Sequence, residues 1–289
     1  MPLYEKHIQP FYTFLDTFFS VIRIVFQTKF RKTLPMTRKH DKCLILGNGP
    51  SLINTLEENL DCLDNYDLIA VNHFATSPEY VKYHPNKYVL CDPAFWVDKP
   101  SEELSQKVNN FYMTMAEVTE WPLELYLPYH AKKCDKINEF FVKNSLVSIK
   151  YYNRIKYEGW GQNIVYQKQW GMPRTQNVLI AALILAVYSG YSHIYLAGAD
   201  NDWIHNLWVD EMNNLRLNDI HFYDRDTAIN NARILTGTMT DQLCSLYFTF
   251  NSYQHVNRFA SKMNCKIINT SPLSFIDTFP KTDLTSIDK

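Results

Sequence analysis

One short stretch, residues 42–52, constrains the fold of this chain more than any other. Residues 43–46 (Cys-Leu-Ile-Leu) form an apolar run typical of a buried parallel strand, and the sequence Gly-Asn-Gly-Pro at 47–50 stops it abruptly. Ser51 is suited to cap the next segment, in which leucines recur at helical spacing. This order of strand, glycine turn and helix predicts a doubly wound α/β fold, which offers backbone N–H groups and a helix N-terminus to a phosphate.

The glycine turn matches the dinucleotide fingerprint G-x-G-x-x-G incompletely. Gly47 and Gly49 occupy the first two glycine positions, whereas Leu52 stands at the third. This departure disfavours a plain NAD site. Two interpretations stay open. The glycines only make a tight turn, or, with the polar Asn48 between them, they allow close approach of a ligand backbone or phosphate.

The rest of the chain repeats the alternation of strand and helix. Strands are predicted at residues 68–71, 88–91, 123–127, 193–198 and 266–269, and helices at 102–112, 137–142, 178–188, 229–235, 240–247 and 254–263. This alternation predicts a Rossmann-like, doubly wound and mostly parallel sheet. The segment 151–170, rich in Tyr, Trp, Gln and Asn, is expected to be a loop that forms an acceptor pocket or lid, or that packs against a partner subunit.

Polar side chains follow two of these strands where each strand ends. Asn72 and His73 come directly after the strand at 68–71, and Asp92 follows the strand at 88–91. Ligands of open α/β sheets bind outside the carboxyl ends of the strands, so these residues are candidates to hold a nucleotide. Each one singly is also explained as a loop cap.

A second block of candidates surrounds the apolar helix predicted at 178–188. Arg174 and Thr175 precede this helix, and Asp200, Asp202 and Trp203 follow the next strand. The βαβ order delivers both groups to the same edge of the sheet. The two carboxylates could hold Mg²⁺ or Mn²⁺ against a diphosphate, although two acids one residue apart also occur at strand ends without a metal.

The N-terminal segment 11–30 is a dense apolar band that Asp16 and Arg23 interrupt and that basic residues follow. It is too short and too interrupted for a transmembrane span and does not match a cleaved signal. It predicts an amphipathic helix that lies on a membrane surface, with the basic residues near anionic lipid. Packing on the catalytic domain or on a second subunit is the alternative.

Composition excludes some classes of protein. Lys and Arg number 29 against 30 Asp and Glu, a formal charge of -1, which excludes nucleic-acid binding by bulk electrostatics. The 6 cysteines are scattered without a C-x-x-C pair, so they are expected to be reduced thiols of a cytoplasmic protein.

Several patches resemble bacterial surface-glycan glycosyltransferases related to the family-42 sialyltransferases. The patches are residues 46–52, Asn72, the Asp-Pro pair at 92–93, the block from Arg174 to Asp200, and residues 268–274 (Ile-Asn-Thr-Ser-Pro-Leu-Ser). The same patches resemble a wider group that contains motility-accessory-factor glycosyltransferases and archaeal 6-hydroxymethylpterin diphosphokinases.

The resemblance implies a single-domain variant of the GT-A fold that uses a CMP-activated nonulosonic acid without a metal. It also implies roles for particular residues: the nucleotide would be held by Gly47, Asn48, Gly49, Ser51 and Asn72, with Arg174 and Thr175 near donor or acceptor. The chain departs from the family at its catalytic histidine, whose position falls near Arg225, while His221 matches an earlier histidine of that segment. The phosphate-binding tyrosines have only Trp203, Trp208 or Tyr223 as counterparts.

Transfer of a sugar from a nucleotide needs a base for the acceptor hydroxyl and a group that neutralises the leaving phosphate. Histidine has a suitable unperturbed pKa for the first role, and His221 is favoured over His205 and His73 because its loop is the most polar. A structural loop histidine is the alternative. Arg174, Arg225 or an ion at the two aspartates would serve the phosphate.

The sequence therefore predicts a glycosyltransferase that moves a sialic acid- or Kdo-like sugar from a CMP donor to a glycan or glycolipid acceptor of a capsule or lipopolysaccharide. The enzyme is expected in the cytoplasm, peripheral on the inner membrane. It is expected to require no cofactor, although Mg or Mn could be used, and a homo-oligomer is possible. The expected division is 1–40 for the helix and linker, 41–280 for the catalytic domain and 281–289 for a tail. The alternatives are a Mg-dependent pyrophosphokinase and a non-catalytic nucleotide-binding scaffold.

Overall fold

The structure is a computed structural model that describes residues 3–30, 34, 37–218, 222 and 232–286. Its centre is a seven-stranded parallel sheet in the order β10-β6-β1-β2-β3-β4-β5. The strands are β1 (Lys42–Leu46), β2 (Asp67–Val71), β3 (Lys87–Val89), β4 (Leu123–Pro128), β5 (Val147–Tyr152), β6 (His193–Ala197) and β10 (Lys266–Asn269). The predicted Rossmann-like parallel sheet is confirmed, because β1 starts a series that runs to one side and β6 starts one on the other.

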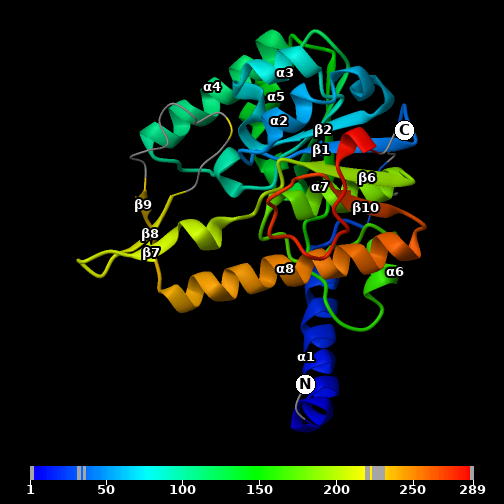
Figure 1. The fold of residues 1–289 in the computed structure, drawn as a ribbon, viewed down its shortest axis with the longest axis vertical. Helices are drawn as coiled ribbons and strands as arrows, with labels where there is room; N and C mark the ends of the chain where they lie inside the picture. The colour runs from blue at the N-terminus through cyan, green and yellow to red at the C-terminus, as the bar shows by residue number, and fades with distance from the viewer. Residues whose placement is uncertain (1–2, 31–33, 35–36, 219–221, 223–231, 287–289) are drawn as a thin grey trace.

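Helices cover both faces of the sheet (Figure 1). One layer holds α2 (Leu52–Glu57), α3 (Pro78–Tyr83), α4 (Glu102–Val118) and α5 (Asp135–Phe141); the other holds α6 (Gln162–Gln167), α7 (Val178–Ser189), α8 (Met239–Lys262) and part of α1 (Leu3–Gln27). Alternate residues of β1 feed the two cores, since Cys43 and Ile45 pack with the α7 layer while Leu44 and Leu46 pack with the α2 layer. Helix α7 is apolar on all sides and almost wholly buried, as such a helix must be.

Short helical turns connect these elements. They are η1 (Leu60–Asn65), η2 (Asn72–Thr76), η3 (Pro93–Phe95), η4 (Tyr129–Lys133), η5 (Trp203–Asn206) and η7 (Leu284–Ser286). All six cysteines are free thiols, as predicted, and Cys43, Cys91 and Cys265 are buried. Burial raises the pKa of each of these three thiols.

Three predicted elements differ in the structure. Residues 147–152 form strand β5 at the sheet edge, whereas the sequence analysis assigned part of this segment to a loop. The predicted helix at 229–235 is wrong where the structure describes it, because Arg233–Ile234 is strand β9 of a small antiparallel sheet with β7 (Leu207–Val209) and β8 (Leu215–Leu217). The two helices predicted after residue 239 are one continuous helix, α8.

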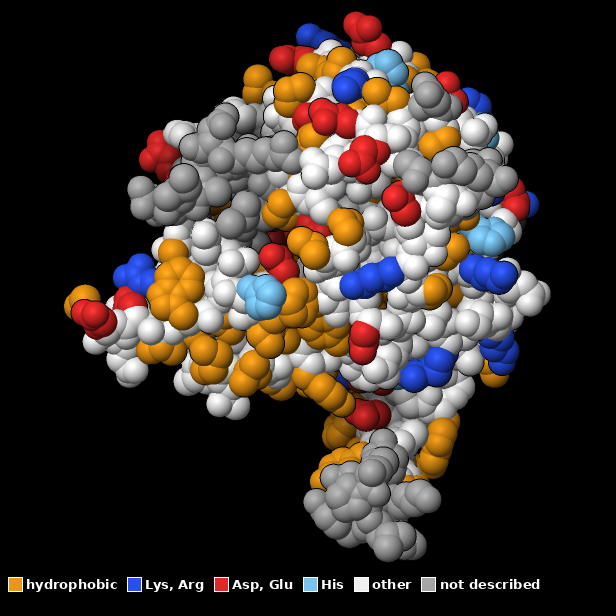
Figure 2. Space-filling model, in the orientation of Figure 1, with side chains coloured by type: hydrophobic (Ala, Val, Ile, Leu, Met, Phe, Trp, Pro, Cys, Tyr) orange, Lys and Arg blue, Asp and Glu red, His pale blue; other side chains and the backbone are white. Residues whose placement is uncertain are grey.

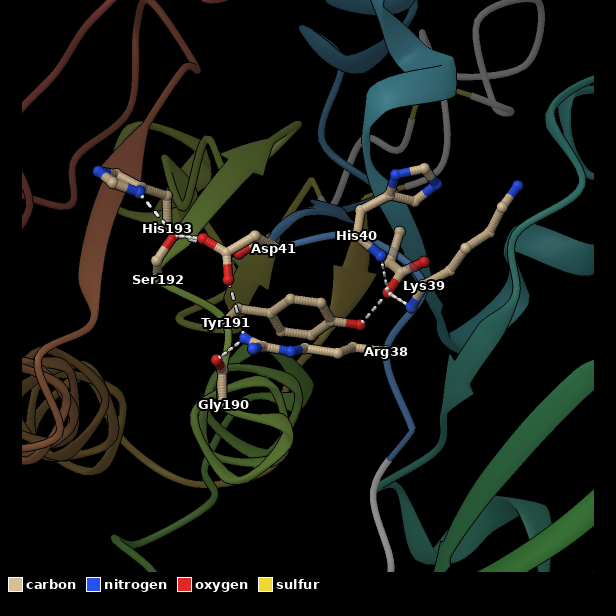
Figure 3. Close-up of polar contacts among 9 residues, drawn as sticks. Arg38, Lys39, His40, Asp41, Gly190, Tyr191, Ser192 and His193 are labelled. Carbon is tan, nitrogen blue, oxygen red and sulfur yellow. Dashed lines mark hydrogen bonds and ion pairs between the residues drawn. The ribbon is translucent and has the colours of Figure 1, made fainter.

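The amino-terminal edge of the parallel sheet is closed by a network around Asp67, the first residue of β2. Its carboxylate, 1% exposed, accepts hydrogen bonds from the backbone N–H groups of Lys39 and His40, from the Tyr191 hydroxyl and from Asn86 Nδ2, at 2.6–3.4 Å. Figure 3 shows the segments around residues 38–41 and 190–193 meeting here. This edge therefore joins the linker after α1 to the end of α7.

Helix α1 projects from the body as a stalk (Figure 1). No helix in the described part of the chain is long and apolar enough to cross a membrane. The predicted N-terminal helix is confirmed as a helix.

Candidate functional site

The carboxyl ends of β1, β2 and β6 meet around a small cavity of about 80 Å³. This is the switch point of the sheet, where the order of the strands reverses between β1 and β6 and where α/β proteins bind ligands. Its walls include Asn48, Asn72, Asn177, Asp200 and Trp203. The structure thus brings together sequence-predicted residues from three separate stretches. A cavity of this size takes a phosphate- or hydroxyl-sized group of a larger ligand.

The glycines of the turn are required by close approach of β6. The Gly47 N–H donates to the Ala197 carbonyl and the Gly49 N–H to the Gly198 carbonyl, both at 2.8 Å. A Cβ at Gly47 would lie 2.4 Å from the Gly198 oxygen, and one at Gly49 would lie 2.2 Å from Asp200 Oδ2. These two N–H groups are thus committed to protein carbonyls rather than turned toward a ligand, which favours the interpretation of a tight turn for the glycines.

Asp200 bridges the end of β6 to the start of α2. Its carboxylate accepts hydrogen bonds from the Ser51 hydroxyl at 2.5 Å and from the Ser51 backbone N–H at 3.0 Å. The side chain of Ser51 therefore does not cap α2, contrary to the sequence prediction. Burial raises the pKa of Asp200, and the bonds from Ser51 partly oppose that shift.

Two asparagines at the ends of β1 and β2 each carry a buried amide oxygen that no residue in the described part of the chain pairs with. Asn48 Nδ2 donates to the Val71 carbonyl at 3.2 Å, which fixes the orientation of that amide. The Oδ1 atoms of Asn48 and Asn72 are buried and accept no hydrogen bond within the described residues. Asn72 also adopts the left-handed backbone region, with φ 50°. A buried acceptor without a donor costs about 1–3 kcal/mol, and a left-handed non-glycine residue adds to that cost, so the strain marks a functional candidate.

The opposite wall of the cavity is a saturated network at the start of α7. Asn177 caps α7, because its Oδ1 accepts from the Leu179 N–H at 2.9 Å. The amide groups of Asn177 and Asn201 both donate to the Tyr253 hydroxyl, at 3.1 and 2.7 Å. Asn201 is buried and left-handed, with φ 50°. These hydrogen bonds tie the wall to α8, and the sequence did not reveal them because Tyr253 lies far along the chain.

The predicted pair Arg174 and Thr175 lies beside the cavity and does not line it. The Arg174 guanidinium stacks on the Phe248 ring of α8 at 3.9 Å. The Thr175 hydroxyl accepts a hydrogen bond of 2.7 Å from Arg154 Nε. Arg154, two residues after β5, is a cation that the sequence analysis missed. Had β5 been predicted as a strand, Arg154 would have been a candidate, because polar residues that follow a strand end lie where α/β proteins bind ligands.

The remaining candidates lie in different places. Asp92 is exposed and caps the turn η3 through the Ala94 N–H at 2.9 Å, so it is not part of the cavity. His73 packs on Phe95 and His205 on Phe275, with ring centroids 4.9 and 4.6 Å apart. Asp202 and Trp203 line the cavity. His221, Tyr223 and Arg225 lie outside the described residues.

The fit of a divalent metal rests on Asp200 and Asp202. The carboxylate of Asp200 is already engaged by Ser51, and the described part of the chain holds no group of three His, Cys, Asp or Glu side chains that could bind a metal ion. The donor set therefore fits a dedicated metal site poorly.

The fold and the switch-point cavity define a Rossmann-like α/β protein. No family model matches the chain, and no curated protein matches it. Among solved structures, the chain is similar to the MAf glycosyltransferase from Magnetospirillum magneticum AMB-1, with a TM-score of 0.50 and 13% sequence identity. The match covers 95% of this chain and 38% of that chain, so this chain corresponds to well under half of that protein. At this identity the likeness concerns the fold.

Proposed function

We propose that this protein is a glycosyltransferase that binds a nucleotide-activated sugar at the switch-point cavity. The observation that carries the proposal is the pair of buried amide oxygens of Asn48 and Asn72, which accept no hydrogen bond from any described residue. An unpartnered acceptor is relieved by a ligand that donates, such as a ribose hydroxyl or the amino group of cytosine. The fold shared with a glycosyltransferase and the sequence resemblance to CMP-sugar enzymes support the same assignment.

The proposed donor is a CMP-activated sugar of the sialic acid or Kdo type, and the proposed acceptor is a glycan or glycolipid. The proposed base for the acceptor hydroxyl is His221, and the proposed cation that neutralises the leaving phosphate is Arg225 or Arg174. Arg174 is held in place by Phe248, and Arg154 adds a second cation to that side through Thr175. No step is assigned to a metal.

A larger cavity next to the first is the proposed position of the acceptor. It measures about 370 Å³ and is lined by Ser51, whose hydroxyl donates to Asp200, a residue that lines the switch-point cavity. Its walls carry hydroxyl and amide groups from α2, from the end of β10 and from residues 281–283. The charged residues of the wall are two acids, Glu58 and Asp283, and one base, Lys281. Asn269 is fully buried, and its Nδ2 has no acceptor within the described residues. A neutral sugar supplies both donors and acceptors, whereas a phosphate would meet two carboxylates.

A thermal-shift panel tests the proposal. CMP, UDP, GDP and ATP are added singly, with and without Mg²⁺, to the wild-type chain and to His221→Ala. We expect CMP alone to raise the melting temperature of both proteins, and we expect hydrolysis of a CMP-sugar by the wild type only. Stabilisation by ATP only with Mg²⁺ would support the pyrophosphokinase alternative. CMP stabilisation without hydrolysis by the wild type would support the non-catalytic scaffold.

A further inference from the structure

Helix α1 contacts the body through its polar stripe, which is the reverse of a normal amphipathic surface helix. The Thr17 hydroxyl accepts from the Trp160 N–H at 2.9 Å, and the Ser20 hydroxyl accepts from the Glu158 N–H at 3.1 Å. Directly after the helix, the Thr28 hydroxyl donates to the Trp170 carbonyl at 2.8 Å. Of the apolar residues of α1, Ile24 alone is buried within positions 10–27. Small hydroxyl side chains and the glycine at 159 let this stripe approach the body closely.

The apolar side chains of α1 point away from the body. Phe14, Phe18 and Phe26 are 50%, 51% and 82% exposed. The exposed apolar positions of the helix are Phe11, Tyr12, Phe14, Phe18, Phe19, Val21, Ile22, Val25 and Phe26. At 3.6 residues per turn they cover about half of the helix circumference. A two-stranded helix pair needs only a narrow seam, so a half-circumference face is too broad for one partner helix and suits a surrounding apolar medium.

The apolar surface continues from α1 onto the body. The Phe14 ring lies 6.4 Å from the ring of Trp160, which is itself 55% exposed, and Ile164 of α6 is exposed nearby in the chain. Figure 2 shows hydrophobic side chains on the stalk and along the adjoining rim of the body. A tryptophan at the base of an apolar helix is typical of a membrane interface.

Basic residues flank this surface where α1 joins the body. Arg23 is exposed on α1 between the apolar face and the docked stripe, and Lys29 and Lys168 line one small cavity at the base of the helix. Cationic side chains beside an apolar helical face complement anionic lipid headgroups. Because no described helix can span a bilayer, the match is to the boundary between headgroups and acyl chains.

We propose that α1 docks this protein on an anionic lipid bilayer, with its phenylalanine face in the bilayer and with Lys29 and Lys168 at the headgroups. Membrane docking by α1 is independent of the sugar transfer proposed for the switch-point cavity. It places the carboxyl-edge site on a membrane-bound protein, where a lipid-linked acceptor would be presented.

Vesicle co-sedimentation of the full chain tests the proposal. The test variant is Phe14→Ser, Phe18→Ser and Phe26→Ser combined. The matched control is Leu60→Ser, Met113→Ser and Val142→Ser, three residues of the opposite helix layer that are 48%, 47% and 77% exposed. We expect the wild type and the control to sediment with phosphatidylglycerol-containing vesicles and the test variant to bind at least about tenfold more weakly. Melting temperatures check that each protein is folded.

The charge requirement has its own variant. Lys29→Glu with Lys168→Glu should weaken binding to anionic vesicles and leave binding to pure phosphatidylcholine vesicles unchanged. The alternative is that a second copy of this chain covers the phenylalanine face. Analytical ultracentrifugation without lipid tests this alternative by measuring the oligomeric state. A dimer that the phenylalanine variant dissociates, together with no vesicle binding by the wild type, would overturn the proposal. Equal vesicle binding by the test variant and the wild type would do the same.

Discussion

The two edges of the parallel sheet differ in how completely their polar groups are paired. At the amino edge, the Asp67 carboxylate accepts four hydrogen bonds from residues of three separate segments. At the carboxyl edge, Asn48 and Asn72 have buried amide oxygens that no described residue donates to, and Asn72 is held in a left-handed conformation. Among the residues that the structure describes, Asn86 Oδ1, beside Asp67, is an exception at the amino edge. The fully engaged Asp67 carboxylate stabilises the fold at the amino edge, whereas the buried oxygens at the carboxyl edge support the nucleotide site that we propose there.

The largest expected effect is on stability at the amino edge. Asp67→Ala leaves two backbone N–H groups, the Tyr191 hydroxyl and the Asn86 amide without their acceptor, so we expect the free energy of unfolding to fall by about 3–5 kcal/mol. Urea denaturation measures the change. Asp64→Ala, an exposed acid beside the same edge, is the control and should stay within about 0.5 kcal/mol. A loss below about 1 kcal/mol for Asp67→Ala would remove the contrast between the edges.

At the carboxyl edge we expect a substitution to weaken ligand binding and to leave stability nearly unchanged. Asn72→Gly keeps the left-handed backbone at little cost and removes the unpartnered amide, so unfolding should change by less than about 1 kcal/mol. CMP affinity, measured by calorimetry, should weaken by about 1–3 kcal/mol. Asn213→Gly is a matched control, since Asn213 is left-handed at φ 62° and exposed at the turn between β7 and β8. Unchanged CMP affinity in Asn72→Gly would argue against the binding role.

A smaller effect is expected at the 370 Å³ cavity that we propose for the acceptor. Asn54→Trp fills the mouth of the cavity from an exposed position of α2, whereas Glu57→Trp on the same helix lies outside the cavity. We expect Asn54→Trp to raise the KM for acceptor by about tenfold, close to 1.4 kcal/mol, with CMP binding unchanged. Steady-state kinetics with a neutral oligosaccharide acceptor measures this. An equal rise in KM for Glu57→Trp would show that the cavity does not take the acceptor.

The smallest expected effect is a pH dependence carried by Asp200. Burial raises its pKa in the folded chain, so the folded state binds this proton more readily than the unfolded chain does. The contribution to stability is thus fully present below the ordinary aspartate pKa and is lost as pH rises through the raised value. Asp200→Asn removes this contribution. Unfolding free energies of the two proteins, measured across the acid range, should differ with that slope, and a difference independent of pH would contradict the assignment.

Much of the fold follows from sequence because its central strands are continuous apolar runs. The strands β1, β2, β6 and β10 and the helix α7 lie within about a residue of their predicted positions. The edge strand β5 was not predicted, since half of its residues are partly exposed and tyrosines continue past its end. The two-residue strand β9 has too few residues for a periodic pattern. The conformation of short or exposed elements depends on contacts with neighbouring elements, and the local sequence does not identify those neighbours.

The candidate site was predicted in part. The rule that ligand groups follow strand ends located Asn48 and Asn72, and the structure brings both to one cavity. The role of the glycine turn was not visible, because the partner of Ser51 is Asp200, 149 residues further along the chain. The same separation hid the network of Asn177 and Asn201 with Tyr253. A contact across the sheet is a property of the topology and leaves no local signal.

A crystal structure with CMP bound tests the central claim most directly. The account predicts that CMP lies outside the carboxyl ends of β1, β2 and β6, with its donor groups within hydrogen-bond distance of the side-chain amides of Asn48 or Asn72. CMP bound at the Asp67 edge or elsewhere, with both amides still unpartnered, would contradict it.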